Sequence, residues 1–189
     1  MKNKELEKLI NDYTAIIERC YVLTKDLNNE QINWKPASDK WSIAECLNHL
    51  AITNNLYYKN AVSAVENAIE KNKTGDNPIK IGVIGKIFMG FEPPPKRRFK
   101  TPRIFSPRKD TVQVFTDEVI KKFVDSKIKM NELIKKSDGL DLNKVKISSP
   151  VTKMIKIRLG EYFSIMAPHD RRHLWQAENL KNHPDFPLV

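Results

Sequence analysis

The sequence predicts an all-α protein, a four-helix bundle formed by a single domain over residues 1–189. The first observation is that four long stretches repeat apolar residues at steps of three and four, which is the period of a helix with one buried face. The second is a long connection, rich in proline and glycine, between the second and third of these stretches. Four helices with one long crossover form a recognised bundle topology.

The first predicted helix covers residues 4–27, and a linker over residues 28–40 is expected to follow it. Pro36 blocks a helix within that linker, and Trp34 is available to cover one end of the core. The buried stripe of this first helix consists of apolar residues at helical spacing, namely Leu6, Leu9, Ile10, Tyr13, Ile16, Ile17, Cys20, Leu23 and Leu27.

The second predicted helix begins at Ser42 and reaches roughly Lys71. Ser42 and Glu45 have the spacing of a capping box, in which each side chain accepts a hydrogen bond from the other residue's backbone N–H. Trp41 and Cys46 occupy the positions of a hydrophobic staple around this cap. The start of this helix is therefore the best specified boundary in the sequence.

Helical periodicity stops between Thr74 and Asp110, where glycine and proline recur. A short helix is expected within residues 79–91, and the rest is expected to run as an extended connection. A connection of this length is uncommon in a compact domain and usually has a function. Its basic, proline-rich part, residues 93–109, is interpreted either as a grip for an anionic substrate or as a solvated crossover.

The third predicted helix begins near Val112 and ends near Gly139, a residue that suits the C′ position after a helix. Residues 140–150 are expected to be irregular or briefly extended, and the last helix is expected to carry residues 162–180. The lysines of the third helix are predicted to form its solvated face, and they are Lys121, Lys122, Lys127, Lys129, Lys135 and Lys136.

The chain carries a formal net charge of +10, and most of this charge belongs to one segment. Residues 76–109 contain nine Lys or Arg against two acids, while residues 1–60 contain eight of each sign. A basic loop is a weak signal for a polyanionic partner, since such loops are also ordinary solvated surface. Nucleic-acid binding through residues 96–108 is therefore a competing hypothesis, and nucleic acid is not the expected partner.

No apolar run approaches the roughly 18 residues of a membrane span, and residues 1–5 lack the apolar core of a signal peptide. We therefore expect a cytoplasmic protein with no membrane partner. Cys20 and Cys46 fall on positions that should be buried, which favours reduced core thiols over a disulfide.

The candidate functional residues are histidines. His169 and His173 lie four residues apart, so on a helix they share one face, and the stripe they occupy is that of core residues. His49 lies on the flank of the second helix's stripe, a position from which it can face a neighbouring helix. Burying two imidazoles costs desolvation twice, which favours a shared metal ion, with hydrogen-bonded core histidines as the alternative. Spacing alone does not identify His49 as the third ligand.

Three further residues are candidates to support such a site. Asp170 and Gln176 are candidate hydrogen-bond partners that would fix the orientation of the imidazoles, with exposure to solvent as the alternative for Asp170. Glu45 lies one turn from His49 and is a third candidate, although its capping role explains it without catalysis.

Two motifs and the basic middle segment make the sequence similar to the DinB-like superfamily, which includes the bacillithiol S-transferases. The motifs are Trp41-Ser42-Ile43-Ala44-Glu45 followed by His49-Leu50, and His169-Asp170-Arg171-Arg172-His173-Leu174-Trp175-Gln176. The resemblance covers nearly the whole chain in order. It implies a four-helix bundle whose three histidines, here His49, His169 and His173, bind a divalent metal such as nickel or zinc, often in a homodimer.

The resemblance further implies a divalent-metal-dependent enzyme, a thiol S-transferase or a hydrolase, that acts on a small-molecule substrate such as a low-molecular-weight thiol. Function varies across this superfamily more than fold does. The alternative is a non-catalytic metal-binding or stress-responsive interaction protein. The residue types leave the metal open, because three imidazoles suit zinc, nickel, copper and iron.

Overall fold

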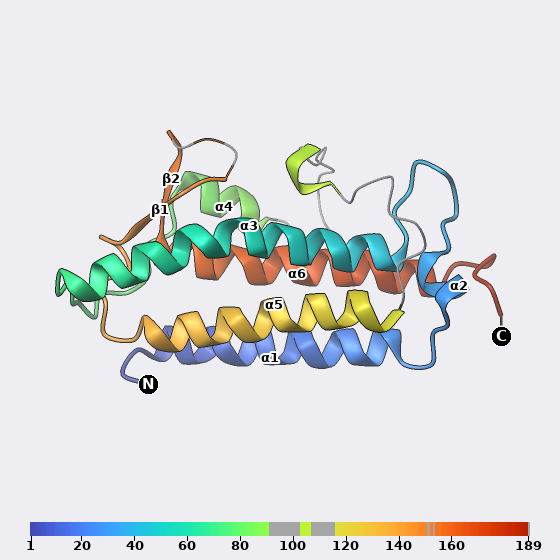
Figure 1. Cartoon of the computed structure of the whole chain (residues 1–189), viewed down its shortest axis with the longest axis horizontal. Coiled ribbons are helices and arrows are strands. Elements are labelled where there is room, and N and C mark those ends of the chain that lie inside the picture. The colour runs from blue at the N-terminus through green and yellow to red at the C-terminus, as the bar shows by residue number, and fades with distance from the viewer. Residues whose placement is uncertain (91–102, 107–115, 151, 153, 189) are drawn as a thin grey trace.

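The structure is a computed structural model that describes residues 1–90, 103–106, 116–150, 152 and 154–188. Four long helices lie side by side (Figure 1) and confirm the predicted all-α bundle. They are α1 (Lys4–Thr24), α3 (Ile43–Glu70), α5 (Thr116–Lys136) and α6 (Leu159–Lys181). Helices α1 and α3 each pack against both α5 and α6, so α1 and α3 occupy opposite corners of the bundle.

The bundle holds together because each long helix buries one apolar stripe. Each large apolar side chain that leaves water contributes about 1.5–3 kcal/mol. Fully buried examples come from all four helices and include Leu6, Tyr13, Leu47, Leu50, Phe123, Met130, Tyr162 and Phe163. Among the described helices, none has the length and apolar character that crossing a membrane requires.

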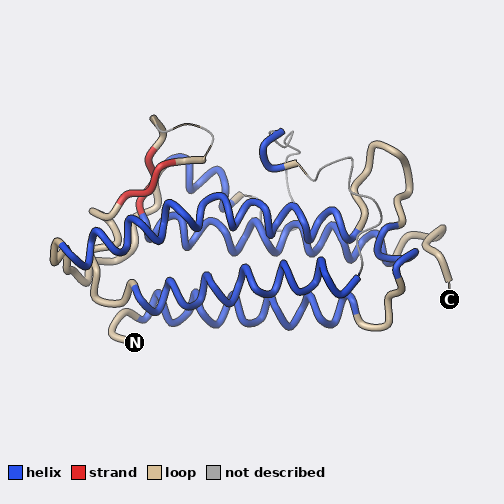
Figure 2. Tube along the Cα trace, in the orientation of Figure 1, coloured by secondary structure: helices blue, strands red, loops and turns tan. Residues whose placement is uncertain are grey.

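In the described parts of the connections, five shorter elements link the long helices; Figure 2 shows where they lie. They are α2 (Asn29–Asn33), α4 (Val83–Met89), the 3-10 turn η1 (Arg103–Phe105), β1 (Lys146–Ser148) and β2 (Lys156–Arg158). The two strands pair antiparallel, with Ile147 opposite Ile157, and β2 leads directly into α6. Both isoleucines are buried. The segment expected to be irregular or briefly extended therefore contributes one strand of a small hairpin.

The start of α3 is the one that the sequence predicts. Ser42 is the N-cap, and its hydroxyl accepts a hydrogen bond from the backbone N–H of Glu45 at 3.1 Å. The Glu45 carboxylate accepts one from the backbone N–H of Ser42 at 2.9 Å. Lys71 caps the other end, as predicted. This doubly bonded cap sets the rotation of α3 from its first turn.

The first connection differs from the predicted linker. Helix α1 ends at Thr24 rather than at residue 27, and Asp26 takes a left-handed backbone with φ 63°, which a helix cannot continue. Asn28 and Gln31 then form a second capping box and start α2. The predicted linker therefore contains a short helix over the five residues of α2, because a local cap stabilises a single helical turn there.

The end of α5 also differs from the prediction. The helix ends at Lys136, and Gly139 takes its φ of +86° in the turn that follows instead of at the C′ position. The predicted start near Val112 lies outside the described residues.

The crossover contains the short helix expected within residues 79–91, which is α4. Helix α4 packs on α6. The buried carboxylate of Glu161, in the first turn of α6, accepts hydrogen bonds from the backbone N–H groups of Gly82 at 3.0 Å and Gly85 at 2.9 Å. The basic stretch of residues 93–109 lies outside the described residues except for 103–106.

Candidate metal centre

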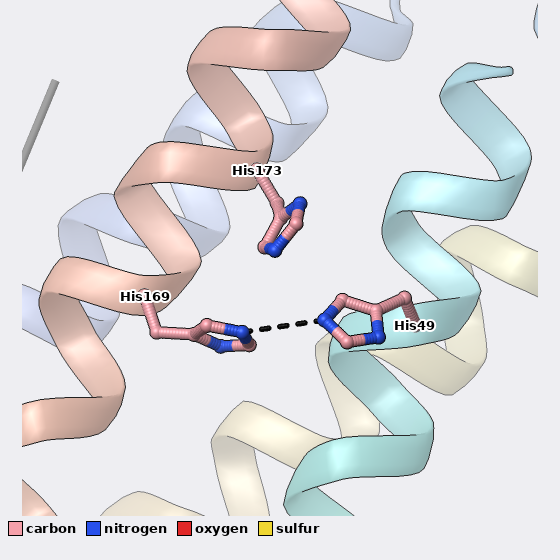
Figure 3. Close-up of side chains that lie close together, drawn as sticks. All are labelled: His49, His169 and His173. Atoms are coloured by element: carbon pink, nitrogen blue, oxygen red, sulfur yellow. Dashed lines mark hydrogen bonds between the residues drawn. The ribbon is translucent and has the colours of Figure 1, made fainter. Parts of the chain in front are cut away.

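Three histidines from two helices meet on the seam between α3 and α6. His49 comes from α3, and His169 and His173 lie one turn apart on α6. Each offers one ring nitrogen, and these three atoms lie within 4.8 Å of one another. Figure 3 shows the three rings turned toward a common point. The structure thus brings together the three histidines that the sequence singles out.

The three rings form T-shaped contacts with one another around that point. Nε2 of His49 lies 3.2 Å from Nε2 of His169. The ring of His173 has its centroid 4.5 Å from that of His49 and 4.8 Å from that of His169. The planes of the three rings are inclined to one another by 65–74°. With such tilts, in-plane lone pairs of the ring nitrogens can converge on one small volume.

One backbone contact selects the tautomer of His49. Nδ1 of His49 lies 2.6 Å from the carbonyl oxygen of Phe105 in η1, so Nδ1 carries the proton that this carbonyl accepts. A neutral His49 then has its lone pair on Nε2, the atom that faces the other histidines. A backbone carbonyl in this role is a common way for proteins to orient a metal-binding imidazole.

Burial keeps all three imidazoles neutral. Only 3%, 9% and 8% of His49, His169 and His173 is exposed. Desolvation is the main cause that lowers the pKa of His49 to about 4 and that of His173 to about 3, and it places the pKa of His169 well below its usual value. Each histidine therefore keeps a free lone pair at neutral pH, as a metal ligand requires.

Within the described residues, the Nδ1 atoms of the two histidines on α6 lack the hydrogen bond that Nδ1 of His49 makes. Their Nδ1 atoms are buried, and neither meets a partner with hydrogen-bond geometry within the described residues. Gln176 approaches His173 closely enough to oppose the lowering of its pKa, as the smallest of the causes. Three neutral nitrogens that converge in a buried place fit a divalent ion, and His49 is the best oriented of them.

Trp41 covers one side of this cluster. Its ring lies nearly parallel to His173, with centroids 5.6 Å apart and an angle of 24°, and its centroid is 4.9 Å from that of His49. The residue just before the Ser42 cap thus shields two of the three imidazoles from water.

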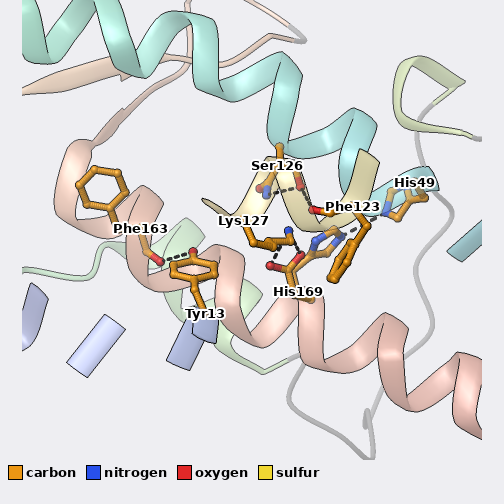
Figure 4. A network of polar contacts seen from close by, with 9 residues as sticks. Tyr13, His49, Phe123, Ser126, Lys127, Phe163 and His169 are labelled. Carbon is orange, nitrogen blue, oxygen red and sulfur yellow. Dashed lines mark hydrogen bonds and ion pairs between the residues drawn. The ribbon is translucent and has the colours of Figure 1, made fainter. Parts of the chain in front are cut away.

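A buried ion pair lies beside the histidines. Asp170 and Lys127 are both 0% exposed, and Nζ of Lys127 lies 2.7 Å from each carboxylate oxygen of Asp170. Figure 4 shows Lys127 reaching from α5 to α6 next to His169. The prediction that Lys127 lies on the solvated face of its helix is wrong, because this lysine points into the core. Asp170 faces that lysine and not solvent.

Burial acts on both members of this pair. Desolvation lowers the pKa of Lys127 and raises that of Asp170, and the charge of each partner opposes the other's shift. The charge of Lys127 also helps to lower the pKa of His49 and His169.

Glu45 is occupied elsewhere. Its carboxylate accepts the backbone N–H of Ser42 and forms an ion pair with Lys35 at 2.6 Å. These contacts are those of a helix cap. The support roles of Glu45, Asp170 and Gln176 stay predictions.

Sequence reasoning missed two contributors to this centre. Lys127 has no local signal, because the lysines near it in sequence, such as Lys122 and Lys129, are exposed and its partner is 43 residues away. The carbonyl of Phe105 has none either, since a backbone group looks alike at every residue. The one hint is spacing: position 127 follows the buried Phe123 by four residues and precedes the buried Met130 by three, so it falls on the buried face of the helix.

Comparison with known proteins gives a family. The family model described as the DinB superfamily matches residues 13–177, a range that includes all three histidines. No curated protein and no solved structure matches the chain. The bundle, the order of its helices and the extent of this match lead to one conclusion: the chain belongs to the DinB superfamily.

Proposed function

We propose that the protein is a divalent-metal-dependent enzyme, with nickel or zinc held by His49, His169 and His173. The observation that supports this best is the convergence of three neutral ring nitrogens, all within 4.8 Å of one another, from two helices of a family bundle. Burying three imidazoles that share no metal ion would cost desolvation free energy that no interaction offsets. Three nitrogen ligands leave coordination positions open, as in catalytic metal sites.

The reaction we propose is thiol S-transfer or hydrolysis of a small molecule. A divalent ion, when bound, supplies a Lewis acid that makes a thiol or a water molecule a better nucleophile at neutral pH. The chain's own residues position and shield the histidines that would hold this ion. The carbonyl of Phe105 fixes His49, Trp41 keeps water from two of the rings, and the pair of Lys127 and Asp170 joins α5 to α6 beside His169.

A low-molecular-weight thiol is the substrate class we propose for the transferase reaction. We also propose a cytoplasmic location and a homodimeric state.

Elemental analysis of the purified protein tests the metal site. We expect roughly one divalent ion per chain in the wild type and its loss in His49→Ala and His173→Ala. His183→Ala is the matched control, because His183 lies beyond α6 and packs on Trp34 instead of on the cluster. A wild type without metal, even after incubation with nickel or zinc, would overturn the proposal.

A second function is favoured by the burial of the site. At most 9% of any of the three histidines is exposed, which suits a structural metal in a non-catalytic metal-binding or stress-responsive interaction protein. Screening low-molecular-weight thiols with electrophiles, and hydrolysable esters and amides, separates the two functions. Metal-dependent turnover that His173→Ala abolishes supports the enzyme, while bound metal without turnover supports the second function.

A further inference from the structure

Three aromatic rings form a stack beside the histidine centre. The ring of Tyr57, in α3, lies nearly parallel to that of Phe105, with centroids 6.1 Å apart and an angle of 5°. It also stacks on Tyr162 of α6, with centroids 5.6 Å apart and an angle of 22°. Offset stacking at such distances is a favourable geometry for aromatic pairs. The stack thus ties the turn η1 to the two helices that carry the histidines.

Phe105 is held by α3 at two places, and η1, the yellow-green turn in Figure 1, packs on that helix. Its backbone carbonyl lies 2.6 Å from Nδ1 of His49, and its buried ring packs on Tyr57. Tyr57 follows His49 by eight residues, which is about 12 Å along a helix. A hydrogen bond depends on direction, and a turn of three residues does little to fix its own position. The ring of Phe105 therefore has to anchor the carbonyl.

The ring of Tyr57 is itself well fixed. Burial raises the pKa of its hydroxyl, and a hydrogen bond with the Ser149 side chain opposes this rise. Ser149 directly follows β1 and is buried. Tyr162, on which the ring of Tyr57 stacks, is 0% exposed. Tyr57 therefore offers Phe105 a rigid, flat surface.

We propose that Tyr57 is a positioning residue of the metal centre, without being one of its three proposed ligands. By stacking on Phe105 it holds the Phe105 carbonyl against Nδ1 of His49. It thereby keeps the lone pair of Nε2 directed at the other two histidines. This role rests on the proposed metal site, and it belongs to a residue outside both histidine motifs.

A purely packing role would have different consequences. If Tyr57 only filled space, its loss would lower the stability of the fold and leave the imidazole of His49 as it is. If Tyr57 positions Phe105, its loss frees the carbonyl, and the proton of His49 can move to Nε2, where it occupies the lone pair that a metal needs. The tautomer of His49 therefore separates the two roles.

The first test measures that tautomer in the metal-free full chain. Long-range proton–nitrogen NMR correlations of the histidine rings should place the proton of His49 on Nδ1 in the wild type and in Tyr57→Phe, which keeps the ring. In Tyr57→Leu, which removes the stack but keeps an apolar side chain, both tautomers should be populated. Tyr58→Leu is the matched control and should resemble the wild type. Burial and the charges of Glu132 and Glu66 raise the pKa of Tyr58, so this side chain lies toward α5.

The second test measures the affinity for zinc by competition with a chelator. The dissociation constant should be at least about tenfold higher in Tyr57→Leu than in the wild type, as when a metal ligand loses its outer hydrogen-bond partner. Tyr57→Phe and Tyr58→Leu should stay within about twofold of the wild type. Phe105→Leu removes the other ring and keeps the carbonyl, so it should resemble Tyr57→Leu. The double variant should bind no more weakly than either single variant, because both substitutions act through one contact.

Two results would overturn the role of Tyr57. One is a His49 tautomer that Tyr57→Leu leaves unchanged, and the other is a pair of effects on zinc affinity that add in the double variant. If circular dichroism shows that Tyr57→Leu does not fold, Phe105→Leu provides the same measurement, and an unchanged tautomer there overturns the role as well. A wild type that binds no zinc or nickel contradicts the proposed function instead, and the metal-free tautomer still decides the role of Tyr57.

Discussion

The carbonyl of Phe105 gives His49 a role that the other two histidines do not share. It holds the proton of His49 on Nδ1, so the lone pair of Nε2 points at the cluster before any ligand arrives. Nε2 of His169, at 3.2 Å, is then the donor toward His49 in the neutral cluster. To serve as a ligand, His169 carries its proton on Nδ1 instead. As a proposed ligand, His49 on α3 is thus preset in its tautomer, whereas His169 on α6 would have to change its tautomer.

We expect that breaking the ion pair of Lys127 and Asp170 by a single substitution strongly lowers the free energy of unfolding. Lys127→Met leaves the Asp170 carboxylate buried without a counter-charge and should lower the free energy of unfolding by about 3–5 kcal/mol. Urea denaturation followed by circular dichroism measures this. Lys122→Met is the control, because Lys122 is solvent-exposed in an ion pair with Glu118. A loss below about 1 kcal/mol, the usual value of an exposed pair, would mean that Asp170 does not need this lysine.

The two thiols should be unreactive in the native protein. Cys20 and Cys46 are free and buried, and burial raises the pKa of Cys20 to about 12 and that of Cys46 still further. The thiolate is the reactive form, so a disulfide reagent at pH 8 should label neither cysteine until a denaturant is added, when both should react. Rapid labelling of the native chain would contradict the burial of α1 and α3 in the core.

The raised pKa values of the two thiols also predict how the stability of the fold changes at alkaline pH. Unfolded thiols lose their protons above about pH 9, whereas the folded ones keep theirs up to about 12 in the case of Cys20. The folded state then binds more protons than the unfolded state, so its stability falls as the pH rises through this window. Cys20→Ala and Cys46→Ala together should flatten that fall.

At the scale of elements, local signals predict helix starts better than helix ends. The cap of Ser42 and Glu45 lies within four residues of sequence, and the structure has it as predicted. The box of Asn28 and Gln31 is equally local, but it starts a helix of five residues that has no room for an apolar period. Helix α1 ends at Thr24 although its apolar period continues to Leu27, because the backbone of Asp26 turns left-handed.

The contact of α4 with α6 depends on a glycine. A Cβ added to Gly85 would lie 2.5 Å from the Glu161 carboxylate oxygen, which is closer than real Cβ atoms come. Gly85→Ala should therefore displace either α4 or the Glu161 side chain and break the hydrogen bond from the Gly85 N–H. Hydrogen exchange should show faster exchange of the amides of α4, with the four long helices unchanged.

Lys86→Ala is the control for that substitution, since Lys86 is exposed on the same helix. It should leave the exchange rates as they are. If Gly85→Ala gave the same rates as the wild type, α4 would not be held to α6 by Glu161.

At the scale of the whole molecule, periodicity predicts the bundle but not which faces meet. The stripe of α6 places His169 and His173 inward, and this can be deduced from sequence alone. That His49 faces them depends on the packing of α3 against α6, a contact across 120 residues that no local pattern encodes. The family motif supplies it instead. The sequence also placed Lys127 on the wrong face, because a charged residue in a lysine-rich helix gives no sign that its partner is in the core.

A metal held by this site joins α3 to α6 and should stabilise the entire fold. A ligand that binds the folded state alone, at a concentration about a hundredfold above its dissociation constant, adds about 2.7 kcal/mol. For a chain of this size that corresponds to a rise in Tm of roughly 5–10 °C. Differential scanning calorimetry of the metal-free protein with added zinc or nickel measures it. Because His173→Ala removes one proposed ligand while His183→Ala leaves the cluster intact, the first variant should lose most of the rise and the second should keep it. An equal rise in both variants would place the metal somewhere other than between α3 and α6, and the bundle would then owe none of its stability to the three histidines.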